Sequence, residues 1–275
     1  MYRKPLLVNK QERLTEKILG KTVSKYNARI FSKVRIADVL DINNSGISNK
    51  EYTYALKAHF DFVITNEDTI PEFIVEFDEK YHKYDRSAIL RDELKNNVCC
   101  RLKLPLLRVT SEYFEKIGDF PSILNWITEL YFTHKTFLDV QAQGEIPLDE
   151  PWIWFSVVGY DPFIFSRIFI QKAYGEGLCG EPIIRVKIGS RDERRYHATL
   201  ATLKIQENKY LTSLVECSAI NFFAVPSGEL SKEIAECNIA KKLMCPDGNK
   251  SEYHTYAEVS KLIKEFDEKY IVIIS

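Results

Sequence analysis

The chain has 275 residues, which leaves open one large domain or two of medium size. Hydrophobic residues make up 45% and aromatic residues 12%, enough to bury a substantial core and to exclude a disordered protein. The 38 basic and 39 acidic side chains nearly cancel. Any binding of nucleic acid therefore has to come from local basic patches rather than from a global excess of positive charge.

The cysteines and the distribution of apolar residues bear on the compartment. The six cysteines form no C-x-x-C pair and have no zinc-finger spacing to a histidine, which is typical of reduced thiols in a cytosolic protein. The first residues lack the apolar core of a signal peptide, and no stretch approaches the ~20 apolar residues that cross a bilayer. We therefore expect a soluble, cytoplasmic protein without a membrane partner.

The first elements alternate between helical and extended patterns. Residues 11–25 have apolar positions at helical spacing with charges between them, which predicts a helix with Asn9 at its N-cap. The run 28–40 is rich in β-branched residues and predicts a strand. Residues 41–50 are rich in Asn, Ser and Gly and predict a loop.

Two apolar runs then lie close together. FDFVIT (60–65) and EFIVEF (72–77) are separated by turn-forming residues, which predicts an antiparallel hairpin. From residue 86 the apolar positions return to helical spacing, and Asp85 is a candidate cap. Pro105 ends this helix, and the run 104–110 predicts a short buried strand.

The polar segment 141–151 contains a glycine and two prolines and is the best linker candidate. It divides the chain into a domain at 1–140 and a second domain at 150–275. The second domain has an α+β pattern. Its expected elements are a helix around 162–174, strands near 182–189 and 197–205, helices at 229–244 and 255–268, and a terminal strand at 270–274.

The hairpin carries a group of carboxylates. Asp61 lies on its first strand, and Glu76 and Asp78 lie on or just after its second. Residues two apart on a strand share a face, so Glu76 and Asp78 project together while Phe77 packs on the other side. Carboxylates that converge beside apolar strands are costly unless a cation neutralises them, and their hard oxygens suit Mg²⁺ or Mn²⁺. The pattern therefore predicts a metal site of Asp61, Glu76 and Asp78.

The following segment adds cationic groups. Arg91 and Lys95 are four residues apart on the predicted helix and share a face, at the rim of the carboxylates where a phosphate would lie. Lys95 is our preferred candidate to stabilise an attacking water or the scissile phosphate. His82 is a candidate for phosphate contact or proton transfer, or alternatively caps the loop before the helix.

In this order the elements resemble the PD-(D/E)XK nuclease superfamily. They are closest to a bacterial branch of unknown function that shares elements with very-short-patch-repair-like endonucleases. The resemblance covers about residues 7–110 and rests on these elements: Asp61-Phe62, Glu76-Phe77-Asp78 with His82, Asp92 with Lys95, and Pro105-Leu106-Leu107-Arg108. Glu12 stands where the first helix of the superfamily often has an acidic residue.

The resemblance implies an α/β fold. It consists of a restriction-endonuclease-like core, with a mixed central sheet flanked by helices, here followed by the α+β C-terminal region. It also implies a Mg²⁺-dependent endonuclease that hydrolyses DNA phosphodiester bonds, with Asp61, Glu76, Asp78, Lys95 and His82 as site residues. The chain departs from the family at Asp78, which stands where the usual E-x-K motif has lysine. Lys95 or Lys80 would have to supply that charge.

Structural alternatives remain open at several positions. Asp78 is equally explained by pairing with Lys80 on the surface, and Asp92 with Lys95 by an exposed ion pair. Arg108 is better explained by a buried ion pair that anchors the helix than by contact with substrate.

In the C-terminal domain, Arg191, Arg194 and Arg195 gather in a predicted hairpin loop. A solvated turn explains them, and contact with a phosphate backbone is the alternative. The rival to a nuclease is a non-catalytic module that keeps the nuclease fold and binds nucleic acid or protein, as one subunit of a defence or mobile-element complex.

Overall fold

The computed structural model describes residues 9–78, 86–114, 121–155, 163–193, 195–244 and 253–274. These residues form two compact units. Unit 1 comprises the described residues within 1–116, 121–160 and 219–224, and unit 2 those within 161–218 and 225–275. The predicted linker at 141–151 lies inside unit 1. The chain folds back on itself there, and the Gln141 side chain donates to the carbonyl oxygens of Pro147 and Glu150.

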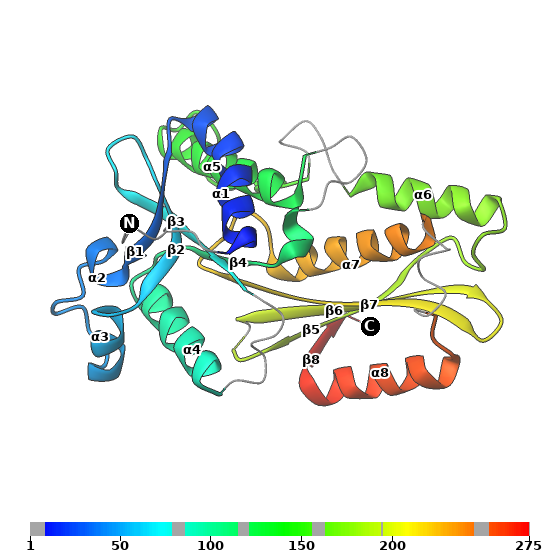
Figure 1. Cartoon of the computed structure of the whole chain (residues 1–275). Coiled ribbons are helices and arrows are strands. Elements are labelled where there is room, and N and C mark those ends of the chain that lie inside the picture. The colour runs from blue at the N-terminus through cyan, green and yellow to red at the C-terminus, as the bar shows by residue number, and fades with distance from the viewer. Residues whose placement is uncertain are drawn as a thin grey trace, which may run out of the picture. The chain divides into compact units, whose positions relative to one another are not determined.

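Unit 1 is built on a mixed sheet (Figure 1), as the sequence predicts. Its strands are β1 (Arg29–Arg35), β2 (His59–Thr65), β3 (Pro71–Phe77) and β4 (Leu106–Val109). β1, β2 and β3 are antiparallel neighbours, whereas β3 and β4 run parallel. Parallel neighbours need a crossover connection, which here contains the helix α4 (Arg86–Arg101). Ala219 and Ile220 extend this sheet by pairing with β4.

Helices cover both faces of the unit 1 sheet. On one face Phe73 packs against the rings of Tyr131 and Phe132 of α5 (Ile123–Ala142). α1 (Lys10–Val23) packs beside α5, since the Asn125 side chain donates to α1 at the Ile18 carbonyl. On the other face Ile74 shares a core cluster with Val98 and Cys99 of α4.

Local signals explain where the helices begin. The Asn9 side chain accepts from the backbone of Gln11, which confirms the predicted N-cap of α1. The predicted strand at 28–40 is too long, because α2 (Ile36–Val39) follows β1 directly. α3 (Asn49–Ala55) begins within the predicted loop at 41–50, and no element was predicted for the rest of it. Ser48 and Glu51 form a capping box there, and that motif is visible in the sequence.

Unit 2 has an antiparallel sheet in the order β7-β6-β5-β8. β7 (Lys209–Ile220) was not predicted, although its residues pair with most of β6. The other elements of unit 2 follow the predicted order: α6 (Ile164–Gly175), β5 (Arg185–Arg191), β6 (Tyr196–Gln206), α7 (Ser227–Met244), α8 (Tyr256–Lys269) and β8 (Ile271–Ile274). Within the described ranges of both units, no helix combines the length and apolar character needed to span a bilayer.

Candidate active site

In β1, the side of the sheet toward which alternate side chains point changes at one residue. Ser32 donates to Glu16 of α1, whereas Val34, two residues further along β1, packs against the core cluster that contains α4. Residues two apart on a regular strand share a face. The reversal therefore lies at Lys33, whose backbone is left-handed with φ +57°. Lys33 stands opposite Asp61, where the regular pairing of β1 and β2 is interrupted between Ser32–Phe62 and Val34–Phe60.

Beyond the Phe62–Val75 pair, two carboxylates replace backbone bonds between β2 and β3. The backbone N–H of Asp61 donates to Oε1 of Glu76 at 3.1 Å, and the backbone N–H of Phe77 donates to Oδ2 of Asp61 at 3.0 Å. The two side chains are thereby fixed beside each other where the strands separate. The sequence prediction that Asp61 and Glu76 converge is confirmed.

Lys95 reaches this pair from α4. Its Nζ donates to Oε2 of Glu76 at 2.5 Å and to the His59 carbonyl oxygen at 3.0 Å. Both side chains are buried, with 10% of Lys95 and 6% of Glu76 exposed. Burial raises the pKa of Glu76 to about 7, although Lys95 beside it acts in the opposite direction. Burial by itself lowers the pKa of Lys95, but Glu76 together with Tyr54 and Asp61 outweighs it and raises that pKa above its usual value.

A second lysine holds the other carboxylate. Lys33 Nζ lies 2.6 Å from Oδ1 of Asp61 and 2.7 Å from Oε1 of Glu12 on α1. Burial lowers the pKa of Lys33, but its hydrogen bonds to Asp61 and Glu12 more than offset this and raise it. Glu12, which the resemblance placed near the site, is thus connected to Asp61 through Lys33. A left-handed backbone costs a non-glycine residue roughly 1–2 kcal/mol, so the surrounding contacts hold Lys33 in this conformation.

Asp78 shares a face with Glu76, as predicted, but its partner is Arg108. The Arg108 guanidinium lies 2.8 Å from Asp78 and 3.3 Å from Asp92, and donates to Asn96 Oδ1 at 2.9 Å. Only 4% of the Arg108 side chain is exposed. The prediction that Arg108 anchors the helix is confirmed, but only the arginine is buried, since 40% of Asp78 and 44% of Asp92 are exposed. The alternative of an exposed Asp92–Lys95 pair is not what the structure shows, because each residue has another partner.

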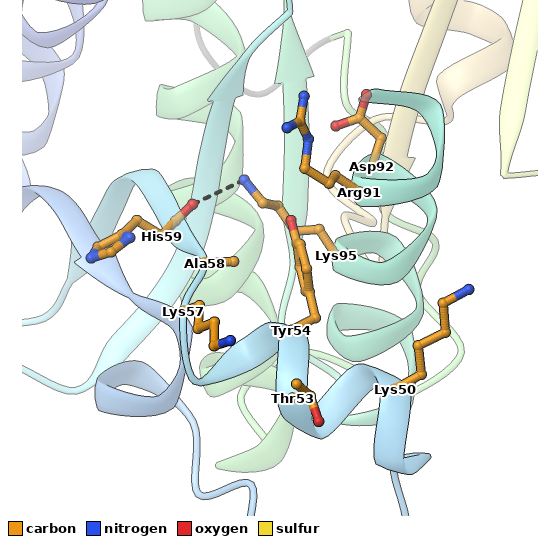
Figure 2. A pocket seen from close by; sticks show the side chains of 9 residues that line it. All are labelled: Lys50, Thr53, Tyr54, Lys57, Ala58, His59, Arg91, Asp92 and Lys95. Atoms are coloured by element: carbon orange, nitrogen blue, oxygen red, sulfur yellow. Dashed lines mark hydrogen bonds between the residues drawn. The ribbon is translucent and has the colours of Figure 1, made fainter. Parts of the chain in front are cut away.

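A groove opens beside Lys95, between α3 and α4 (Figure 2). Its volume is about 780 Å³. Arg91 and Lys95 both line it, as their predicted shared helical face requires. The remaining lining residues are Lys50, Thr53, Tyr54, Lys57, Ala58, His59 and Asp92.

Several predicted contacts lie elsewhere. His82, Lys80 and Arg194 lie outside the described residues. In unit 2, Arg191 forms an ion pair with Glu216 at 2.9 Å and lies over the ring of Tyr196. Arg195 is half-buried and lies 3.9 Å from Glu193. Arg191 is therefore part of an internal network rather than a simply solvated turn.

Lys33, Lys50 and Lys57 were not predicted as site residues. Lys33 looks like any polar residue in the strand pattern ARIFSKVRI, and its place opposite Asp61 depends on the strand pairing. Lys50 lies in the first turn of α3, and Lys57 lies two residues after its end. The start of α3 was expected to be a loop. The Ser48–Glu51 capping box is the sequence signal that would have placed both lysines at the ends of one helix.

Asp61 and Glu76 suit a hard divalent cation by their chemistry. Mg²⁺ in proteins commonly takes one or two carboxylates and keeps several waters. In the ranges that the structure describes, no group of three or more Asp, Glu, His or Cys side chains is placed to hold a metal ion. The predicted third ligand, Asp78, is engaged with Arg108. Asp61 and Glu76 are thus the two carboxylates that would hold such an ion, and each of them already contacts a lysine.

Comparison with known proteins finds one similarity, which lies in the N-terminal part of the chain. Residues 3–121 match a family described as a protein of unknown function, DUF2726. This match contains Asp61, Glu76, Lys95, Arg108 and the groove. No curated protein and no solved structure matches the chain. The segment similar to DUF2726 is therefore the one that builds the candidate active site.

Proposed function

We propose that unit 1 is a metal-dependent nuclease that hydrolyses phosphodiester bonds of DNA. The observation that carries the proposal is the contact of Lys95 with Glu76, beside Asp61. Nuclease sites of the PD-(D/E)XK type combine two acidic groups with a lysine. Here Lys95 from the following helix supplies the charge that the E-x-D sequence lacks.

In this proposal Asp61 and Glu76 hold Mg²⁺ or Mn²⁺. Such an ion, when bound, lowers the pKa of a bound water and stabilises negative charge on the phosphate. Asp78 is assigned no metal contact and instead orients Arg108.

Lys95 acts on the substrate side of the site. An ammonium group has three N–H donors, and Lys95 uses two of them for Glu76 and His59. The third donor is available for the attacking water or a phosphate oxygen. A fixed donor of this kind stabilises developing negative charge without reorganising during the reaction.

The experiment that tests the proposal is a cleavage assay with the full chain on single-stranded and double-stranded DNA. Product is expected with Mg²⁺ or Mn²⁺ and is expected to disappear with EDTA. Cleavage that persists in EDTA, or no cleavage of either substrate with either metal, would refute a metal-dependent DNA nuclease.

One observation favours a second candidate, a nuclease-fold module that binds nucleic acid or a partner protein without cutting. Lys33 and Lys95 already neutralise Asp61 and Glu76, so the carboxylate pair is compensated by the chain's own cations. Titration calorimetry separates the two candidates. A nuclease is expected to bind Mg²⁺ or Mn²⁺ with a heat that EDTA abolishes, whereas the non-catalytic module is expected to bind neither.

Lys33→Met is expected to strengthen Mg²⁺ binding by about tenfold if the nuclease proposal holds. The ammonium of Lys33 competes with a divalent cation for Asp61, and an ion pair of about 1.4 kcal/mol corresponds to a tenfold change in affinity. Calorimetry of the variant provides the measurement. Lys21→Met, an exposed position on the same helix as Glu12, is the matched control and should leave the affinity unchanged. Weaker or equal binding in Lys33→Met contradicts the competition.

A further inference from the structure

The groove between α3 and α4 has a charge that the chain as a whole does not have. The formal net charge of the chain is −1. Four of the nine lining residues are cationic, namely Lys50, Lys57, Arg91 and Lys95, and one is acidic, Asp92. Lys95 is paired with Glu76, and Asp92 shares Arg108 with Asp78, so the lining keeps three further cations against one carboxylate. The groove is therefore a local basic surface on a chain of balanced composition.

Three of these cations are exposed and available. Lys50, Lys57 and Arg91 are exposed, and within the described ranges none of them forms an ion pair. They lie on both sides of the groove, since Lys50 and Lys57 come from α3 and the turn after it, and Arg91 comes from α4. Exposed cations on two walls with no acidic partner are suited to an extended anion that lies between them.

The groove also leads to the carboxylate pair. Lys95 lines the groove and contacts Glu76, so a ligand in the groove lies next to the proposed reaction site (Figure 2). Figure 2 shows the Lys95 side chain extending from α4 to the His59 carbonyl, with Tyr54 of α3 beside it. Arg191, another predicted phosphate contact, belongs to unit 2 and is held by Glu216.

We propose that this groove binds the phosphodiester backbone of a nucleic-acid strand, through Lys50, Lys57 and Arg91, and directs it to Lys95 and Glu76. The inference rests on the proposed function for the role of Glu76, but the binding itself does not require cleavage. Backbone contacts of this kind are independent of base sequence. Their signature is an affinity that falls steeply with salt, because each neutralised phosphate releases counterions.

The test measures binding without cleavage. Fluorescence anisotropy with the full chain in EDTA follows a labelled single strand of about 15 nucleotides and the corresponding duplex. The variant Lys50→Gln/Lys57→Gln/Arg91→Gln is expected to raise the Kd for the single strand by at least about tenfold. The slope of log K against log salt should become less steep by about 2, since three contacts each contribute about 0.7 for a single strand.

The matched control is Lys10→Gln/Lys17→Gln/Lys21→Gln, which removes three exposed lysines from α1 outside the groove and should change the Kd less than about twofold. Circular dichroism of both variants establishes that they are folded. Equal Kd values for the groove variant and the wild type would overturn the inference. So would binding of a mononucleotide or inorganic phosphate as tight as that of the strand, because the groove would then be a small-anion site.

The outcomes also separate the two proposals. A wild-type protein that binds DNA through the groove but never cuts it would refute the nuclease and leave the groove inference standing. A protein that cuts DNA at the same rate, and binds it with the same Kd, after the three substitutions would support the nuclease and overturn the groove.

Discussion

Glu76→Gln is expected to reduce the rate of Mg²⁺-dependent DNA cleavage by about 10³-fold or more. The substitution keeps the shape of the side chain but removes the charge that would hold the metal ion and that positions Lys95. Loss of a single preorganised electrostatic group in an active site commonly costs 10²–10³ in kcat, and here two effects combine. Initial rates on plasmid DNA provide the measurement, and retention of more than about a tenth of the wild-type rate contradicts the assignment.

A control on the same strand separates chemistry from folding. Glu72 also pairs with a lysine, Lys135, at 2.5 Å, and 11% of its side chain is exposed. Glu72→Gln removes a comparable charge away from the site and is expected to leave the cleavage rate unchanged.

A second variant controls for the stability of the site. Glu76→Gln leaves Lys95 buried without its counter-charge, which destabilises the fold. Glu76→Gln/Lys95→Met removes both charges and is expected to recover much of the lost stability while remaining inactive. Recovery of cleavage in the double variant would place the chemistry elsewhere.

The sequence predicted the part of the site that depends on local periodicity. The hairpin follows from two β-rich runs around a turn, and its alternation places Glu76 and Asp78 on the face of α4. The helical period then places Arg91 and Lys95 together. Lys95 was the preferred candidate beside the carboxylates, from its helical spacing and the resemblance, but the choice between Lys95 and Lys80 stayed open until the structure showed the Lys95–Glu76 contact.

Other features depend on contacts between distant segments and were not predictable. Lys33 contacts Asp61 because β1 reverses its faces at Lys33, whose backbone is left-handed. This conformation is uncommon for a non-glycine residue, so the sequence does not predict it. β7, which contributes to both units, was missed because the polarity of its residues does not follow their burial: Thr212 and Ser213 are buried, whereas Leu214 is exposed. The boundary between units is also non-local, since residues 219–224 return to unit 1.

Arg108→Met is expected to lower the free energy of unfolding of unit 1 by about 2–4 kcal/mol. Arg108 is buried, and its hydrogen bonds join β4 to α4 through Asn96 and Asp92. Urea unfolding followed by tryptophan fluorescence measures this unit, because Trp126, Trp152 and Trp154 all belong to it. Arg101→Met is the control on α4, since 56% of that side chain is exposed and its distance to Glu51 is 3.7 Å. Arg101→Met should lower the free energy of unfolding by less than about 1 kcal/mol.

Urea unfolding and Mg²⁺ calorimetry together decide the role of Asp78, the residue at which the chain departs from the E-x-K pattern. If Asp78 serves to orient Arg108, Asp78→Asn lowers the stability of unit 1 and leaves the affinity for Mg²⁺ unchanged. If Asp78 is instead a metal ligand, the affinity falls. In that case Arg108 has to release Asp78 when the metal binds, and Arg108→Met would then tighten Mg²⁺ binding rather than leave it unaltered. In both cases Lys95 has to supply the positive charge that the usual lysine provides, so the acidic residue at position 78 does not by itself exclude a nuclease.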